Sequence, residues 1–115
     1  MSSYRYKGLL KGSLQTIILK LLKENQRMYG YEITQVVKEI TSGEIQLTEG
    51  ALYPALHKME NEGLLATSTE QVDNRVRKYY ALTQAGREEV ETKLKETRSF
   101  MANLELLLNL NPQLS

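Results

Sequence analysis

The sequence contains no cysteine or tryptophan, and His57 is its only histidine. The lack of cysteine excludes disulfides and thiolate metal sites, which is typical of proteins in a reducing cytoplasm. A lone histidine also leaves zinc without its usual nitrogen and sulfur ligands. We therefore predict a cytoplasmic protein that holds no metal and no cofactor.

The residue sets that catalysis requires are missing as well. His57 has no cysteine or second histidine to work with, and no glycine-rich phosphate loop occurs. Glu60 and Glu62 fall on the surface of a predicted helix, where solvated carboxylates are ordinary. Because no run of about 18 apolar residues exists, we also expect no membrane contact. We predict that the protein is not an enzyme.

Charge is unevenly distributed along a chain whose formal net charge is only +1. Residues 1–27 carry six basic side chains against one acidic, and residues 73–80 carry three against one. Residues 44–63 carry four acidic side chains against one basic. Basic flanks of this kind fit a phosphate-binding footprint, but they also fit an ordinary solvated surface.

Apolar residues at helical spacing predict two helices in the first part of the chain. The first covers residues 12–24 with Ser13 as its N-cap, and the second covers residues 29–40 and ends near Gly43. Residues 25–28 read as a polar connection. The expected core positions are Leu14, Ile17, Ile18, Leu21 and Leu22 in the first helix and Ile33, Val36, Val37 and Ile40 in the second.

A third amphipathic helix is predicted over Thr48–Leu65. Thr48 can cap its first turn, and Gly63 can adopt the left-handed conformation that ends a helix. Its apolar face consists of Leu52, Ala55, Leu56 and Met59. Tyr53 lies near the face that this apolar stripe leaves free.

The pattern then changes to a β-hairpin and a long helix. Residues 65–82 are rich in β-branched and aromatic residues around the turn signal Asp73-Asn74. Thr83 can cap a last helix that runs from Gln84 to about Asn109. Its apolar residues follow a heptad spacing that cannot be buried within one helix, so the helix must pack on the domain or on a partner chain. These residues are Val90, Leu94, Thr97, Met101, Leu104 and Leu108, with Phe100 and Leu107 beside them.

Three helices followed by a hairpin form the element order of a winged helix. The predicted fold class is mainly α with a small β-hairpin, a winged helix-turn-helix plus a long C-terminal helix. We expect a DNA-binding domain at residues 1–83, a dimerisation helix at 84–111 and a tail at 112–115.

Several motifs in this order carry a resemblance to a known family. They are Gly12-Ser13-Leu14, Tyr29-Gly30-Tyr31-Glu32-Ile33, Gly50-Ala51-Leu52-Tyr53-Pro54-Ala55-Leu56 with Glu60, Gly63-Leu64-Leu65, and Arg77-Lys78-Tyr79-Tyr80-Ala81-Leu82-Thr83 with Gly86. Over roughly residues 8–90 the chain resembles the PadR family of bacterial transcriptional regulators, in its short type with one C-terminal helix. The resemblance implies a homodimeric repressor that binds double-stranded DNA at a pseudo-palindromic operator.

The third helix and the hairpin supply the candidate DNA-binding residues. Backbone N–H groups at a helix N-terminus favour phosphate, and arginine or lysine on a wing suits the DNA backbone. Tyr53 could bond a phosphate or pack against the second helix, and Glu49 could meet a cytosine or only stabilise the helix dipole. The candidates are Thr48, Glu49, Gly50, Tyr53, His57, Arg75, Arg77 and Lys78.

The last helix supplies the expected dimer interface: Val90, Leu94, Thr97, Phe100, Met101, Leu104, Leu107 and Leu108. Some members of the family release DNA when a small aromatic molecule binds between subunits. Stacking aromatics are scarce here, because Phe100 is the one aromatic residue of the last helix. Any effector of this protein is therefore unknown, and two alternatives stay open: a winged helix that binds a protein instead of DNA, and a dimer that mainly senses a ligand.

Overall fold

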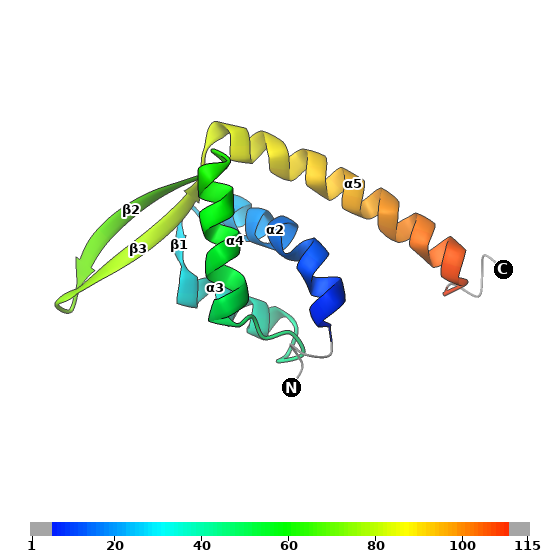
Figure 1. The fold of residues 1–115 in the computed structure, drawn as a ribbon, viewed down its shortest axis with the longest axis horizontal. Coiled ribbons are helices and arrows are strands. Elements are labelled where there is room, and N and C mark those ends of the chain that lie inside the picture. The colour runs from blue at the N-terminus through cyan, green and yellow to red at the C-terminus, as the bar shows by residue number, and fades with distance from the viewer. Residues whose placement is uncertain (1–5, 111–115) are drawn as a thin grey trace.

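The computed structural model describes residues 6–110, in which four helices gather at one end of a small antiparallel sheet (Figure 1). The elements are α2 (Lys7–Glu24), β1 (Met28–Tyr29), α3 (Gly30–Ile40), α4 (Glu49–Asn61), β2 (Leu65–Val72), β3 (Arg75–Leu82) and α5 (Gln84–Leu108). This order confirms the predicted fold class. The expected tail, 112–115, and residue 111 of the expected dimerisation helix lie outside the described residues.

Helix α2 is the central helix of the fold. It begins at Lys7, so the predicted start at residue 12 was wrong. Ser13 is not a cap, because its Oγ donates to the carbonyl of Leu9 within the helix at 3.4 Å. The helix continues through Gly8 and Gly12 because Leu10 packs against the core, and tertiary packing of this kind outweighs the low helix propensity of glycine.

The sheet contains a strand that the sequence did not predict. Met28 was expected in a polar connection and Tyr29 in the first turn of the second helix, yet they pair with Tyr80 and Tyr79 of β3, and α3 begins only at Gly30. The strand order is β1-β3-β2. A strand of two residues is too short to show an alternating pattern, and burial of Met28 under the sheet fixes it in place.

The hairpin of β2 and β3 agrees with its prediction and forms the wing of the fold. Its register runs from Leu65 opposite Leu82 to Val72 opposite Arg75. Asp73 and Asn74 have φ angles of 49° and 64°, the left-handed pair that a tight two-residue hairpin turn requires. The wing projects away from the helices on the left of Figure 1.

Helix α4 has the predicted N-terminus but a different end. The Thr48 side chain accepts a hydrogen bond from the backbone N–H of Ala51 at 3.2 Å. The helix ends at Asn61 rather than at residue 65, because Gly63 turns left-handed with φ of 79° and Leu65 already opens β2. Another correction concerns α3, where Ile40 is 70% exposed and not part of the core.

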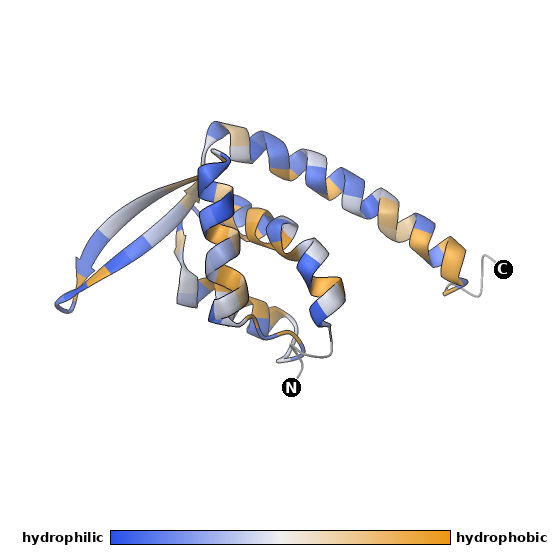
Figure 2. Cartoon of the chain, in the orientation of Figure 1, coloured by the Kyte–Doolittle hydropathy of each residue, from blue (hydrophilic) through white to orange (hydrophobic). Residues whose placement is uncertain are grey.

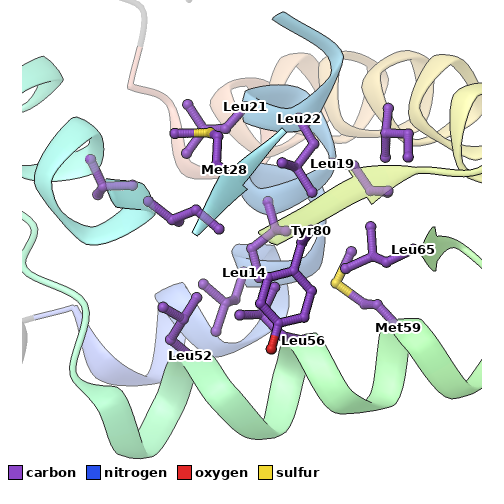
Figure 3. Packing of buried hydrophobic residues seen from close by; sticks show 14 of the residues in the cluster. Leu14, Leu19, Leu21, Leu22, Met28, Leu52, Leu56, Met59, Leu65 and Tyr80 are labelled. Atoms are coloured by element: carbon purple, nitrogen blue, oxygen red, sulfur yellow. The ribbon is translucent and has the colours of Figure 1, made fainter. Parts of the chain in front are cut away.

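The core lies between α2, α4 and the base of the sheet. Figure 3 shows Leu52, Leu56 and Met59 pointing from α4 towards α2 and β3. Leu52 and Leu56 have no exposed surface. This packing fixes which face of α4 remains exposed to solvent.

The end of α4 is bound directly to the beginning of α5. Thr83 Oγ1 donates to the Gly63 carbonyl at 2.6 Å and accepts from the Gly86 N–H at 3.0 Å. The Thr83 N–H donates to the Leu64 carbonyl at 3.0 Å. A Cβ atom on Gly86 would lie 2.2 Å from that same carbonyl oxygen, so only glycine fits there without displacing backbone. We call these contacts the α4–α5 junction.

Helix α5 has two unlike halves. Its first half packs on α2, with Val90 in the core and Glu91 paired with Lys23 at 2.7 Å. Its second half extends away from the other elements and becomes more hydrophobic towards its end (Figure 2). Large apolar side chains are exposed along it: Phe100, Met101, Leu106, Leu107, Leu108 and, just beyond the helix, Leu110. Within residues 6–110, no helix combines the length and apolar character that crossing a membrane requires.

The α4–α5 junction makes a stability prediction. Replacing Gly86 with alanine should lower the free energy of unfolding by about 1–3 kcal/mol, because the methyl group meets the Leu64 carbonyl. The matched control is Gly12→Ala in α2, where a Cβ meets nothing within 4 Å. That change should raise stability by about 0.5–1 kcal/mol. Urea unfolding at one protein concentration measures both, and equal effects would contradict the close contact at Gly86.

Candidate nucleic-acid interface

Helix α4 presents one face to the core and leaves the opposite face exposed. Gly50, Pro54 and His57 are exposed and lie on the side opposite Leu52 and Leu56. The helical period therefore places His57 on the solvent side, as expected from the sequence. A solvent-facing helix face of this kind is what can enter a DNA groove.

A groove lies between α4 and the wing, and we call it the wing groove. Five of the eight candidate DNA-binding residues line it: Tyr53, His57, Arg75, Arg77 and Lys78. Tyr29, Gly30, Tyr31, Val72, Val76 and Tyr80 complete its walls. Thr48 and Gly50 instead line a second groove between α4 and α2, beside Lys7, Lys11 and Lys58. The fold thus brings five candidates to one side of α4 and places two on the other.

Tyr53 lies in the wing groove with its phenol over the start of α3. A Cβ on Gly30 would be 2.3 Å from the Tyr53 hydroxyl oxygen, so the glycine makes room for the ring. Burial raises the pKa of Tyr53, and the nearby Glu49 and Tyr80 raise it further. The side chain is nevertheless 37% exposed, so packing against α3 leaves part of it accessible.

Lys78 is held on the α4 side of the wing by Glu60. Its Nζ lies 3.7 Å from Glu60 Oε1, and Thr67 Oγ1 donates to Glu60 Oε2 at 3.2 Å. Both charged side chains remain partly exposed, so the pair is worth little in free energy and Lys78 can exchange it for a phosphate. Glu60 thereby links α4 to the wing, a role that the sequence did not suggest.

The wing also carries a stack of arginine and tyrosine side chains that the sequence did not predict. The Arg27 guanidinium carbon lies 3.9 Å from the Tyr79 ring centroid, and that of Arg77 lies 4.1 Å from the Tyr29 ring centroid. The two rings meet edge to face at 5.6 Å. Arg27 also forms an ion pair with Glu70 of β2. We call Arg27, Tyr79, Tyr29 and Arg77 the wing stack.

Two arginines of the wing differ in their surroundings. A hydrogen bond between the side chains of Arg77 and Tyr79 raises the pKa of Arg77 still further above neutral pH. Arg75 lies beside the hairpin turn, is exposed, and makes no ion pair within residues 6–110. Arg77 is therefore held in place, whereas Arg75 is free to move.

Residues 18–92 match the model of the "Transcriptional regulator PadR-like family". The chain belongs to this family. The match spans α3, α4, the whole wing and the first part of α5, so it covers the wing groove, and it confirms the resemblance drawn from the sequence motifs. The members of this PadR-like family are transcriptional regulators, which agrees with a function other than catalysis.

Individual transcriptional regulators are similar over most of the chain. A transcriptional regulator of Mycobacterium tuberculosis is 34% identical over 77 residues, which are 67% of this chain and 68% of that protein. The structure of a transcriptional regulator from Clostridium thermocellum superposes with a TM-score of 0.76 at 27% identity, covering 89% of this chain and 95% of that one.

A structure of Bacillus subtilis PadR in complex with operator DNA also matches. It has a TM-score of 0.64 and 30% identity, and the match covers 70% of this chain and 46% of that chain. The match therefore spans less than half of the Bacillus subtilis chain. Among the matched proteins, this one is described bound to operator DNA.

The contact between Gly30 and Tyr53 makes a prediction about acidity. Replacing Gly30 with alanine should push the phenol into solvent, and the raised pKa of Tyr53 should fall towards 10.0. Ultraviolet absorbance titration measures this pKa. Subtracting the titration curve of the Tyr53→Phe variant, made in both the wild-type and the Gly30→Ala protein, isolates the signal of the Tyr53 phenol.

The same change has a consequence for stability at high pH. A raised pKa means that the folded state holds the Tyr53 proton more tightly, so folding loses stability as the pH rises through that pKa. The Gly30→Ala protein should lack this component. Gly50→Ala, on the helix that carries Tyr53, is the control, because a Cβ there meets nothing within 4 Å. An unchanged Tyr53 pKa in Gly30→Ala would contradict the packing.

Proposed function

We propose that this protein is a homodimeric repressor that binds a pseudo-palindromic operator through α4 and the wing. The observation that carries the proposal is the wing groove, where the exposed side of a capped helix meets three cationic side chains of a hairpin. The operator-bound relative from Bacillus subtilis supports DNA as the ligand.

The N-terminal half of α4 is the part suited to reading DNA. Thr48, Glu49 and Gly50 form the helix N-terminus, where free backbone N–H groups favour a phosphate, and His57 lies about two turns further on the exposed face. Glu60 and Glu62 make the C-terminal end acidic, so phosphates are repelled from it. In this proposal, contact with base edges is confined to the first two turns of the helix.

The wing supplies affinity rather than sequence preference. Arg75, Arg77 and Lys78 are the cations placed to contact the DNA backbone, and Tyr53 can donate its phenolic hydroxyl to a phosphate from the opposite wall. Contacts to phosphate fix the position of a protein on the duplex but carry no direct sequence information. Binding should therefore weaken steeply as salt is added.

The second half of α5 is the proposed dimer interface. A second copy of the chain would cover Phe100, Met101, Leu107 and Leu108, which are exposed here, together with the half-buried Thr97 and Leu104. Val90 is 1% exposed and packs in the core of its own chain, so it is removed from the expected interface, and Leu94 is partly committed to that core. Leu106 and Leu110 enlarge the apolar surface beyond the predicted seam.

We accordingly divide the chain into a DNA-binding part, 1–83, and a dimerisation part, 84–111. A dimer through α5 would present two copies of α4 to one face of a duplex. Repression would follow if the operator overlaps the site where transcription begins, because the bound dimer then blocks access to it.

Selection of duplexes from a random-sequence pool tests the DNA-binding proposal. The enriched sequences should contain two inverted half-sites whose centres are about 34–36 Å apart, one helical turn of DNA. A reporter gene placed behind the enriched site should be silenced when the protein is present. Failure to enrich any duplex would instead favour a winged helix that binds a protein.

A charge placed in the apolar part of α5 tests the dimer. Leu107→Asp should convert the dimer to a monomer without unfolding it, because this side chain is 79% exposed in the single chain. Val76→Asp is the matched control, since Val76 is 72% exposed but lies on the wing. Analytical ultracentrifugation reads the outcome. A dimer that survives Leu107→Asp would place the interface elsewhere.

A further inference from the structure

We propose that the wing stack is a tether that fixes the wing, and that Arg27 is a positioning residue for DNA binding although it does not itself contact DNA. The inference rests on the proposed function and adds to it a residue that lies outside the candidate interface. It is carried by the contacts that join Arg27 and Tyr29 to the hairpin.

The tether acts on one pair of opposed residues in the wing. Glu70 of β2 and Arg77 of β3 face each other in the register of the hairpin. Arg27 forms an ion pair with Glu70, and Tyr29 lies under the guanidinium of Arg77. Arg27 and Tyr29, two positions apart in the chain, therefore hold the two opposed residues Glu70 and Arg77.

The position of Glu70 and Arg77 along the hairpin determines how much of the wing the tether holds. Beyond this pair, two more residue pairs separate it from the turn at Asp73 and Asn74. The wing is anchored at its base by pairing of β1 with Tyr79 and Tyr80. The contacts of Arg27 and Tyr29 extend that anchorage outward by two to three residues, so only the tip is left without support.

The stack leaves Arg77 able to bind an anion. A guanidinium stacked on a ring uses its flat face, and the N–H groups at its edge remain available in the plane. Arg77 also lines the wing groove. Its charge is thus preorganised beside α4, and less side-chain freedom is lost when a phosphate binds.

Arg27 differs from Arg77 because its charge is already paired with a carboxylate of the protein. Its guanidinium is placed over Tyr79 and paired with Glu70, and it is not among the residues that line the wing groove. Loss of Arg27 should therefore loosen the wing and displace Arg77 without removing a phosphate contact.

The test compares Arg27→Gln with Lys23→Gln in the full-length protein. Both changes remove one positive charge near the end of α2, and both break an ion pair with a glutamate. The probes are a duplex enriched by the wild-type protein and, in parallel, amide hydrogen exchange of residues 66–72 and 75–81 without DNA. Arg75→Gln serves as the reference for loss of a phosphate contact.

Arg27→Gln should speed hairpin exchange about five-fold and weaken duplex binding about three- to five-fold, in line with the loss of exposed cation–π contacts. The slope of log affinity against log salt should stay at the wild-type value. Arg75→Gln should reduce that slope by about 0.9. Arg27→Lys, which keeps the charge but not the planar stack, should recover part of both losses, and Lys23→Gln should change neither.

Three results would overturn the proposal. Unchanged amide exchange of the hairpin in Arg27→Gln would show that the wing stack does not fix the wing. An equal loss of duplex affinity in Lys23→Gln would show that the effect comes from net charge alone. A salt slope that falls as it does in Arg75→Gln would make Arg27 a direct phosphate contact. If the wild-type protein binds no duplex but Arg27→Gln still speeds hairpin exchange, the tether is supported and the DNA-binding function is what fails.

Discussion

The burial of one face of α4 is the constraint on which the rest of the structure depends. Leu52 and Leu56 are fully enclosed by α2 and the base of the sheet, so the helix cannot rotate without exposing them. Burying a leucine is worth roughly 1.5–3 kcal/mol, so such a rotation would cost a large share of a small domain's stability. The side chains on the free face, His57 among them, therefore have a fixed direction before any ligand arrives.

The charged residues around α4 hold side chains of the wing in place as well as providing charge for a ligand. Glu60 of α4 holds Lys78 of the wing, and Glu70 of the wing holds Arg27, which lies just before β1, so two carboxylates connect the hairpin to the rest of the domain. Each pair is partly exposed and weak in isolation. Together with the stacked rings of Tyr29 and Tyr79 they restrict a hairpin that would otherwise be joined to the domain mainly at its base.

The sequence predicted those elements that depend on residues close together in the chain. Helical spacing gave the buried face of α4, and Asp73-Asn74 gave the hairpin turn. The same reasoning missed Leu19, which is fully buried because α2 contacts both α4 and α5 and so is covered on more than one side. It also missed β1, Glu60 and Arg27, since their partners are distant in the chain. Eight candidate DNA-binding residues could be named from motifs, but the fold places five in the wing groove, two in the groove between α4 and α2, and Glu49 in neither, and this division depends on how the elements pack together.

The α4–α5 junction has a mechanical consequence. A single residue, Thr83, separates the last residue of β3 from the first of α5, and its side chain is bonded to the end of α4. This connection is too short to absorb a change in the angle between α4 and α5. In a dimer joined through α5, a small rotation between the two copies of α5 would therefore change the distance between the two copies of α4. If α4 binds DNA as proposed, a molecule that altered how the α5 helices cross would change DNA binding without touching a DNA-contacting residue.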